Sequence, residues 1–310
     1  MPIAAGHAKR QPDAFERTSK HAKASSKHDK AKHERAPAHA ASKATAADKP
    51  AESSKPTHVK VAALGPTSLP ASALNPGLSC KPAKFRIVLD VGHTAESEGA
   101  ISARNVPEFS FNLRLAQQID EKLKAAGFAE TRLLVTEGKA KPSLFKRVAA
   151  ANDLNADLFL SIHHDSVPDK LLENWEYEGE KSHYSDRFSG YSVFVSHINP
   201  QFKTSLAFAE LVAKEMKAKG LQYAPQYTMA IMGHDQHPLL DKDVGVYAYD
   251  KLVVLRKTNM PAVLLEAGSI INRSEELKMD SPERRDMVSD AVVSAVKDFC
   301  GLQEPFLGPP

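Results

Sequence analysis

Residues 85–93 read FRIVLDVGH. A short, mostly apolar run that ends at Gly92 is typical of a strand buried inside a sheet, because little of it needs water and the glycine permits a sharp turn. His93 follows this turn directly, and histidine is a common metal ligand and acid–base group. The segment therefore predicts a central strand with a chemically active side chain at its carboxyl end.

The residues that follow alternate between strand and helix patterns. Helical spacing of apolar residues predicts helices, with Ser143 capping the second of them, and short apolar runs predict strands. Alternating strands and helices indicate one α/β domain whose mostly parallel central sheet is flanked by helices on both faces, with ligands at the carboxyl ends of the strands. The helices are predicted at 107–127, 143–154, 204–219 and 282–299, and the strands at 85–91, 131–135, 158–163, 191–196, 252–255 and 262–265.

The chain divides by charge into a basic first part and a mildly acidic body. Residues 1–60 hold 13 Lys and Arg against 6 Asp and Glu, whereas the other 250 residues hold 28 against 32. We expect residues 1–79 to be a disordered tail and linker rich in His, Lys and Ala, residues 80–301 to be the folded domain, and residues 302–310 to be a flexible C-terminus. The tail histidines either bind metal weakly or belong to a solvated linker that adheres to anionic polymers.

Two cysteines, Cys80 and Cys300, bracket the predicted domain. They indicate either a disulfide formed in an oxidising compartment or two unrelated buried thiols. The chain has no run of about 20 apolar residues, so we expect no membrane-spanning segment. Residues 1–8 resemble the small-residue end of a signal peptide whose other parts lie upstream, so we expect a periplasmic or secreted protein.

Three segments place ionisable side chains at the ends of predicted strands. They read DVGH at 90–93, SIHHD at 161–165 and PAVLLEAG at 261–268, and a further acid, Glu108, opens the first predicted helix. Two imidazoles and a carboxylate in one crevice fit a catalytic zinc site, which uses three protein ligands and leaves a position for water. A further glutamate that binds no metal would then serve as base and acid.

Glu108 and His93 each have an alternative interpretation. Glu108 lies three residues after Asn105, which is the spacing of a capping box in which the glutamate reaches back to the cap amide. His93 can be a turn residue without a ligand role. Spacing alone leaves both interpretations open.

His163 and His164 are adjacent on a predicted strand, so their side chains leave opposite faces and only one can easily reach a given metal. Glu266 ends an apolar strand, where a carboxylate needs a partner or a function because burying it alone is costly.

Four motifs in order resemble the zinc-dependent N-acetylmuramoyl-L-alanine amidases of the cell-separation type, over roughly residues 84–299. This family has Asp-x-Gly-His then Gly-Ala, a glutamate heading a helix rich in Asn and Leu, Ser-Ile-His after Ala-Asp-Leu, and Pro-x-x-Leu-x-Glu followed by Gly and Asn. The matching residues here are 90–93 and 99–100, 108 and 111–113, 156–158 and 161–163, and 261–266, 268 and 272.

The resemblance implies His93, Glu108 and His163 as zinc ligands and Glu266 as the catalytic glutamate of an amidase domain over residues 80–301. It also implies hydrolysis of the amide between N-acetylmuramic acid and L-alanine in peptidoglycan by a zinc-activated water. Two alternatives are a zinc peptidase that cleaves another peptidoglycan amide and a cell-wall-binding module without catalysis.

The sequence departs from the family pattern at His164, where a small residue is usual. We expect His164 and Arg256 to lie beside the metal site or on the cleft wall. The aromatic segment 171–190 is either a lid over the substrate or a loop packed on its own aromatics. Peptidoglycan is the expected partner, nucleic acid is not expected, and a regulatory activator is left open.

Overall fold

The computed structural model describes residues 80–302. The tail and linker predicted for residues 1–79, with the segment that resembles a signal peptide, lie outside the described residues. So do residues 303–310 of the predicted C-terminal extension.

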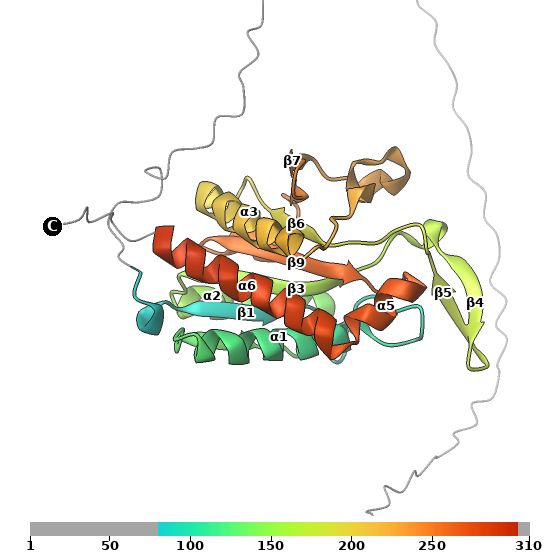
Figure 1. Ribbon diagram of the computed structural model, residues 1–310, viewed down its shortest axis with the longest axis horizontal. Coiled ribbons are helices and arrows are strands. Elements are labelled where there is room, and N and C mark those ends of the chain that lie inside the picture. The colour runs from blue at the N-terminus through green and yellow to red at the C-terminus, as the bar shows by residue number, and fades with distance from the viewer. Residues whose placement is uncertain (1–79, 303–310) are drawn as a thin grey trace, which may run out of the picture. The chain divides into compact units, whose positions relative to one another are not determined.

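Seven strands form one sheet in the middle of the domain, in the order β2-β1-β3-β9-β6-β8-β7 (Figure 1). Strands β2, β1, β3 and β9 run parallel, β6 joins β9 antiparallel, β8 is parallel to β6, and β7 is antiparallel to β8. The sheet is thus mostly parallel, which confirms the predicted α/β architecture. The strands are β1 (Ile87–Val91), β2 (Thr131–Leu134), β3 (Leu158–Asp165), β6 (Ser192–Val195), β7 (Leu239–Asp241), β8 (Val246–Ala248) and β9 (Ala262–Ser269).

Helices cover both faces of the sheet. Helices α1 (Glu108–Ala125), α3 (Phe202–Ala218) and α6 (Pro282–Leu302) pack on one face, in front of the strands in Figure 1. Helices α2 (Ala140–Asp153) and α4 (Val253–Lys257) pack on the other. None of the described helices is both long enough and apolar enough to cross a membrane. A sheet buried on both faces in this way requires the continuous apolar runs from which the strands were predicted.

The remaining elements are short and lie around the edges of the domain. Helix α5 (Arg273–Met279) follows β9, and its first turn is capped by Asn272, which accepts hydrogen bonds from two backbone amides. The 3-10 helices are η2 (Pro82–Lys84), η3 (Asp169–Leu171), η4 (Pro225–Thr228) and η5 (Ala230–Asp235).

The strand predicted at residues 252–255 is wrong, because this segment begins helix α4. A short apolar run does not distinguish a strand from one buried turn of helix. Here β9 already has β3 and β6 as neighbours, so the sheet has no place for another strand beside it. The run instead buries Val254 and Leu255 against the face that α2 also covers.

The cap predicted at Ser143 is also wrong. Helix α2 begins three residues earlier, at Ala140, and its N-cap residue Lys139 makes no side-chain cap hydrogen bond. The Ser143 hydroxyl donates to the carbonyl of Ala140, inside the first turn. Pro142 lies in this first turn, where no partner for its missing amide hydrogen is needed, so it does not mark the start of the helix.

Segment 171–190 contains an antiparallel hairpin of β4 (Glu173–Tyr177) and β5 (Glu180–Tyr184) that extends away from the sheet (Figure 1). The Trp175 ring stacks on Tyr177 with centroids 5.7 Å apart. The Arg273 guanidinium lies over the Trp175 ring at 5.2 Å. The aromatics therefore pack on one another and on an arginine of the body, which favours the second of the two interpretations of this segment.

Cys80 and Cys300 form a disulfide, with Cα atoms 5.3 Å apart and a sequence separation of 220 residues. Both cysteines are buried, within the core that also contains Phe85 and Phe299. The bond joins the start of the described chain to the last helix, and the pairing predicted from the two cysteines is confirmed.

Replacing both Cys80 and Cys300 by alanine is expected to lower the free energy of unfolding by about 2–5 kcal/mol, because the cross-link removes conformational entropy from the unfolded chain over a long loop. Urea denaturation of oxidised wild type, reduced wild type and the variant measures the effect. Equal midpoints for all three proteins would show that the cross-link does not stabilise the fold.

Candidate metal centre

His93 lies in a tight turn after β1 and has a positive backbone angle φ of 66°. The preceding Gly92 has no room for a side chain, because a Cβ atom there would lie 2.5 Å from the His163 ring. At Gly99 a Cβ would lie 2.4 Å from the Glu108 carboxylate, and φ is +82°. Both glycines therefore let the backbone approach the side chains that the sequence singled out.

Glu108 is the first residue of α1, and its side chain makes no capping interaction with Asn105. The residue at the cap position is Pro107. The carboxylate accepts a hydrogen bond from the amide of Ala100 at 3.1 Å and from the Asn112 side chain at 3.1 Å. The capping-box interpretation is therefore wrong, and the carboxylate faces the two histidines instead.

His163 and His164 leave opposite faces of β3, as adjacent strand residues must. His163 Nδ1 lies 3.0 Å from Glu108 Oε1. His164 is buried against Phe111 on the side of α1, and its Nδ1 donates to Asn112 Oδ1 at 2.8 Å. Burial lowers the pKa of His164 to about 3, so its ring is neutral. His164 thus lies beneath the cluster rather than on the cleft wall.

His93, Glu108 and His163 place their ligand atoms within 4.8 Å of one another. His93 Nε2 lies 2.9 Å from Glu108 Oε2. Burial alone would raise the pKa of the Glu108 carboxyl, but hydrogen bonds and charge from His163 and His93 hold it well below its usual range. Two imidazole nitrogens and an ionised carboxylate at this spacing are a donor set suited to a tetrahedral zinc ion.

Glu266 lies on β9 directly beside His163 of β3, because the two residues are partners in the register of these parallel strands. Both side chains therefore leave the same face of the sheet. The Oε2 atom of Glu266 is buried and has no hydrogen-bond partner among the described residues. Burial raises the pKa of Glu266 well above its usual value, and the charges of Asp165 and Glu108 raise it further.

A buried ion pair supports the His93 turn, and the sequence analysis did not single out its cation. Arg147 of α2 contacts Asp90 of β1 at 2.7 Å, and Ser161 of β3 donates to the same carboxylate at 2.7 Å. Arg147 lies on the apolar side of α2 with Leu144 and Val148. A charged residue within such a stripe was the available signal, because it requires a buried partner.

Asp165, at the end of β3, anchors the 3-10 helix η4 in the connection between α3 and β7. Tyr227 donates its hydroxyl to Asp165 at 2.5 Å, and Gln226 donates its amide at 3.2 Å. Burial raises the pKa of Asp165 to about 7. Arg256 is half-buried on α4 and is not among the residues that line the pocket beside the histidines, and its buried Nε has no hydrogen-bond partner within residues 80–302.

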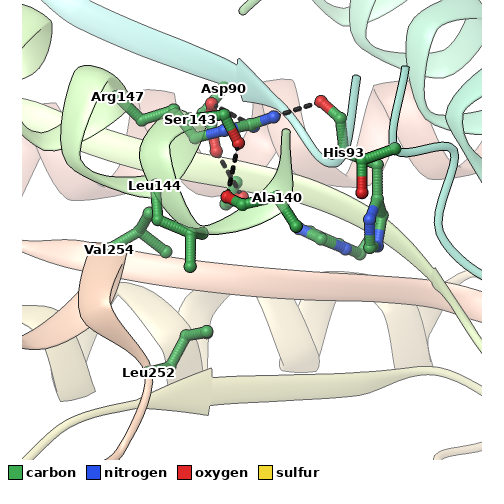
Figure 2. A pocket seen from close by; sticks show the side chains of 11 residues that line it. Asp90, His93, Ala140, Ser143, Leu144, Arg147, Leu252 and Val254 are labelled. Carbon is green, nitrogen blue, oxygen red and sulfur yellow. Dashed lines mark hydrogen bonds and ion pairs between the residues drawn. The ribbon is translucent and has the colours of Figure 1, made fainter. Parts of the chain in front are cut away.

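A pocket of about 200 Å³ opens beside His93 and His163. Figure 2 shows the apolar side chains Leu144, Leu252 and Val254 on one side of it and His93 on the other. The candidate metal centre thus borders a cavity rather than lying in the closed core.

An α/β domain with a His–Glu–His group where two strands end and a helix begins, and with a further carboxylate beside it, has the site of a metal-dependent hydrolase. The family model Amidase_3, described as N-acetylmuramoyl-L-alanine amidase, matches residues 87–298, more than half of the chain. The chain belongs to this family, as the four motifs predicted.

Known proteins with similar sequences agree with this assignment. A Buchnera aphidicola protein provisionally named an N-acetylmuramoyl-L-alanine amidase is 23% identical over 217 residues, which cover 69% of this chain and 95% of that protein. The Staphylococcus aureus protein LytH, described as a probable cell wall amidase, is 26% identical over 215 residues, which cover 69% of this chain and 57% of LytH.

Solved structures share the fold. The amidase Ami1 from Mycobacterium smegmatis superimposes with a TM-score of 0.54 at 22% identity, covering 71% of this chain and 99% of Ami1. The catalytic domain of CwlV from Bacillus (Paenibacillus) polymyxa gives a TM-score of 0.51 at 24% identity, covering 70% of this chain and 98% of CwlV.

Proposed function

We propose that this chain hydrolyses the amide bond between N-acetylmuramic acid and L-alanine in peptidoglycan. Family membership supports the substrate class. The observation that carries the proposal is the grouping of His93, Glu108 and His163 with Glu266 beside them on the same face of the sheet. A wall-binding module without catalysis would have no need for a carboxylate whose buried oxygen is unpaired at this place.

The proposed zinc ligands are His93, Glu108 and His163. They come from the turn after β1, the first turn of α1 and the end of β3, three elements that the packing of the domain holds together. Bound zinc supplies a Lewis acid that polarises the amide carbonyl and lowers the pKa of a water molecule. Hydrogen bonds and charge from the two histidines favour the ionised form of Glu108, which is the form that binds a metal ion.

Glu266 is the proposed proton carrier. Its carboxylate accepts a proton from the attacking water and passes it to the nitrogen of the L-alanine leaving group. Burial raises the pKa of Glu266, which makes its carboxylate a stronger base for the water proton than an exposed carboxylate would be. This role is supported because Glu266 is the register partner of His163 and is not one of the three residues of the His–Glu–His group.

Digestion of purified peptidoglycan tests the function. We expect new L-alanine amino termini on free stem peptides and glycan strands that keep intact, peptide-free muramic acid, both identified by mass spectrometry. Cleavage at another stem-peptide bond would instead indicate the zinc peptidase alternative. Binding to the polymer with no release of fragments at saturating zinc would indicate the non-catalytic wall-binding module.

We further propose a periplasmic or secreted location, because peptidoglycan lies outside the cytoplasm and the Cys80–Cys300 disulfide requires an oxidising compartment. A regulatory partner is part of this proposal. The structure of CwlD from Clostridioides difficile, a neighbour with a TM-score of 0.51, 18% identity and coverage of 70% of this chain and 98% of CwlD, is that of a complex with the GerS lipoprotein.

A further inference from the structure

Arg147 lies on helix α2, behind the group formed by His93, Glu108 and His163, and only 2% of its surface is exposed. It is the largest fully buried side chain within the described residues. Figure 2 shows its guanidinium directed toward the turn that carries His93. A fully buried arginine is costly unless every charge is balanced and hydrogen-bonded, so its partners indicate its role.

The guanidinium of Arg147 holds both sides of this turn. One nitrogen, Nη1, donates to the Asp90 carboxylate at 2.7 Å and also to the carbonyl of Val91. The other terminal nitrogen, Nη2, donates to the carbonyl of His93 itself. One planar group thus contacts the last two residues of β1 and the first proposed zinc ligand.

His93 needs such support because its backbone angle φ is 66°. This value lies in the left-handed region, which residues other than glycine rarely adopt. A residue in this region is strained, and it keeps this conformation only when its surroundings fix it. Asn112 contributes from the α1 side, where its side chain donates to the Gly92 carbonyl at 3.2 Å. Arg147 is the contact that fixes the carbonyl of His93 from the α2 side.

The same network extends to the strand of the second histidine. Ser161 of β3 donates to Asp90 Oδ2, the oxygen that Arg147 leaves free, and Ser161 lies two residues before His163 on the same face of the strand. Asp90 therefore balances the charge of Arg147 and ties β1 to β3. The two histidines stand on backbone segments that one buried ion pair connects.

We propose that Arg147 is a positioning residue that sets the affinity of the site for zinc by holding the His93 turn in its ligating conformation. This inference rests on the proposed function, because it takes His93 as a zinc ligand. The proposed role of Arg147 differs from that of an ordinary core ion pair in one measurable respect. A merely structural pair changes the stability of the fold, whereas a positioning residue also changes the metal dissociation constant.

Arg147→Lys is the primary variant, because it keeps the positive charge that buried Asp90 requires. Lysine is a point charge without the planar fork of arginine, so it cannot replace all three contacts in their present geometry. Groups that orient metal ligands typically contribute 10- to 100-fold to metal affinity. We therefore expect the zinc dissociation constant, measured by competition with a chelating dye, to rise 10- to 100-fold.

Arg86→Lys is the matched control. Arg86 directly precedes β1, at the end of the strand opposite to His93. Its guanidinium donates two hydrogen bonds to the Asp157 carboxylate and one to the carbonyl of Leu154. The change removes a similar fork far from the histidines, so the zinc dissociation constant should stay within about twofold of wild type. The double variant Asp90→Asn with Arg147→Gln provides a second test, because it removes both buried charges together and should also bind zinc 10- to 100-fold more weakly.

The possible outcomes distinguish a failure of the positioning role from a failure of the proposed function. The positioning role is overturned if wild type binds zinc and both Arg147 variants have zinc dissociation constants within about twofold of the wild-type value. If the metal-free variants also melt at a lower temperature than metal-free wild type, the ion pair is structural. If wild type binds no zinc at all, the proposed function is overturned before this inference is reached. Weaker zinc binding in the Arg147 variants and unchanged binding in Arg86→Lys support it.

Discussion

Replacing Glu266 by glutamine is expected to reduce turnover of peptidoglycan by about 10²-fold or more while the zinc content stays that of wild type. Glutamine keeps the size of the side chain and an oxygen that accepts hydrogen bonds, but it cannot carry the proton, and general acid–base catalysis contributes 10²–10⁴-fold. Dye release from labelled sacculi measures turnover, and atomic absorption measures bound zinc.

Glu276→Gln is the matched control for this prediction. Glu276 is also a buried carboxylate near the end of the chain, but it pairs with Arg104 at 2.5 Å and is not part of the His–Glu–His group. Its replacement should lower stability without changing turnover at temperatures where the protein is folded. Zinc loss in Glu266→Gln would make Glu266 a ligand, and near-normal turnover would place the base elsewhere.

Replacing His163 by alanine is expected to abolish stoichiometric zinc binding and, with it, detectable hydrolysis. A zinc site of three protein ligands that loses one imidazole keeps only His93 and Glu108, and the neighbouring His164 cannot replace it because that ring is buried on the other face of β3. Equilibrium dialysis against buffered zinc measures the binding, and the peptidoglycan digest measures the activity.

His183→Ala is the control for losing a histidine, because His183 is exposed on the β4–β5 hairpin and should leave zinc content unchanged. Glu108→Ala should weaken zinc binding as well, although both histidines remain. Full zinc occupancy in His163→Ala would contradict the ligand assignment and would require that β3 present its other face to the metal.

The arrangement of the fold was predicted where the sequence pattern is long and regular. The helix with apolar residues every four positions, predicted at 107–127, is α1 at Glu108–Ala125. The prediction failed at 252–255, where four apolar residues carry too little periodicity to distinguish a strand from a helical turn. Strands β7 and β8, with three residues each, were missed for the same reason.

The sequence by itself predicted that the strand ends carrying His93, the adjacent His163 and His164, and Glu266 would meet, and the resemblance to the amidase family selected His163 of the two adjacent histidines. Each follows or ends an apolar run, and the carboxyl ends of neighbouring parallel strands converge at one edge of a sheet. The meeting of the strand ends follows from the order of the predicted elements, whereas the alternation of side chains shows only that His163 and His164 leave opposite faces.

Only the tertiary structure decided what Glu108 and Arg147 do. From spacing alone, Glu108 could be either a helix-capping residue or a metal ligand. In the folded domain β3 and the His93 turn lie close to α1, so the Glu108 carboxylate contacts both histidines. Arg147 and Asp90 are 57 residues apart in sequence, and their pairing exists only because α2 packs on the sheet behind β1. A buried charged side chain contacts residues that are distant in sequence and that only folding brings near. No local sequence pattern identifies those partners.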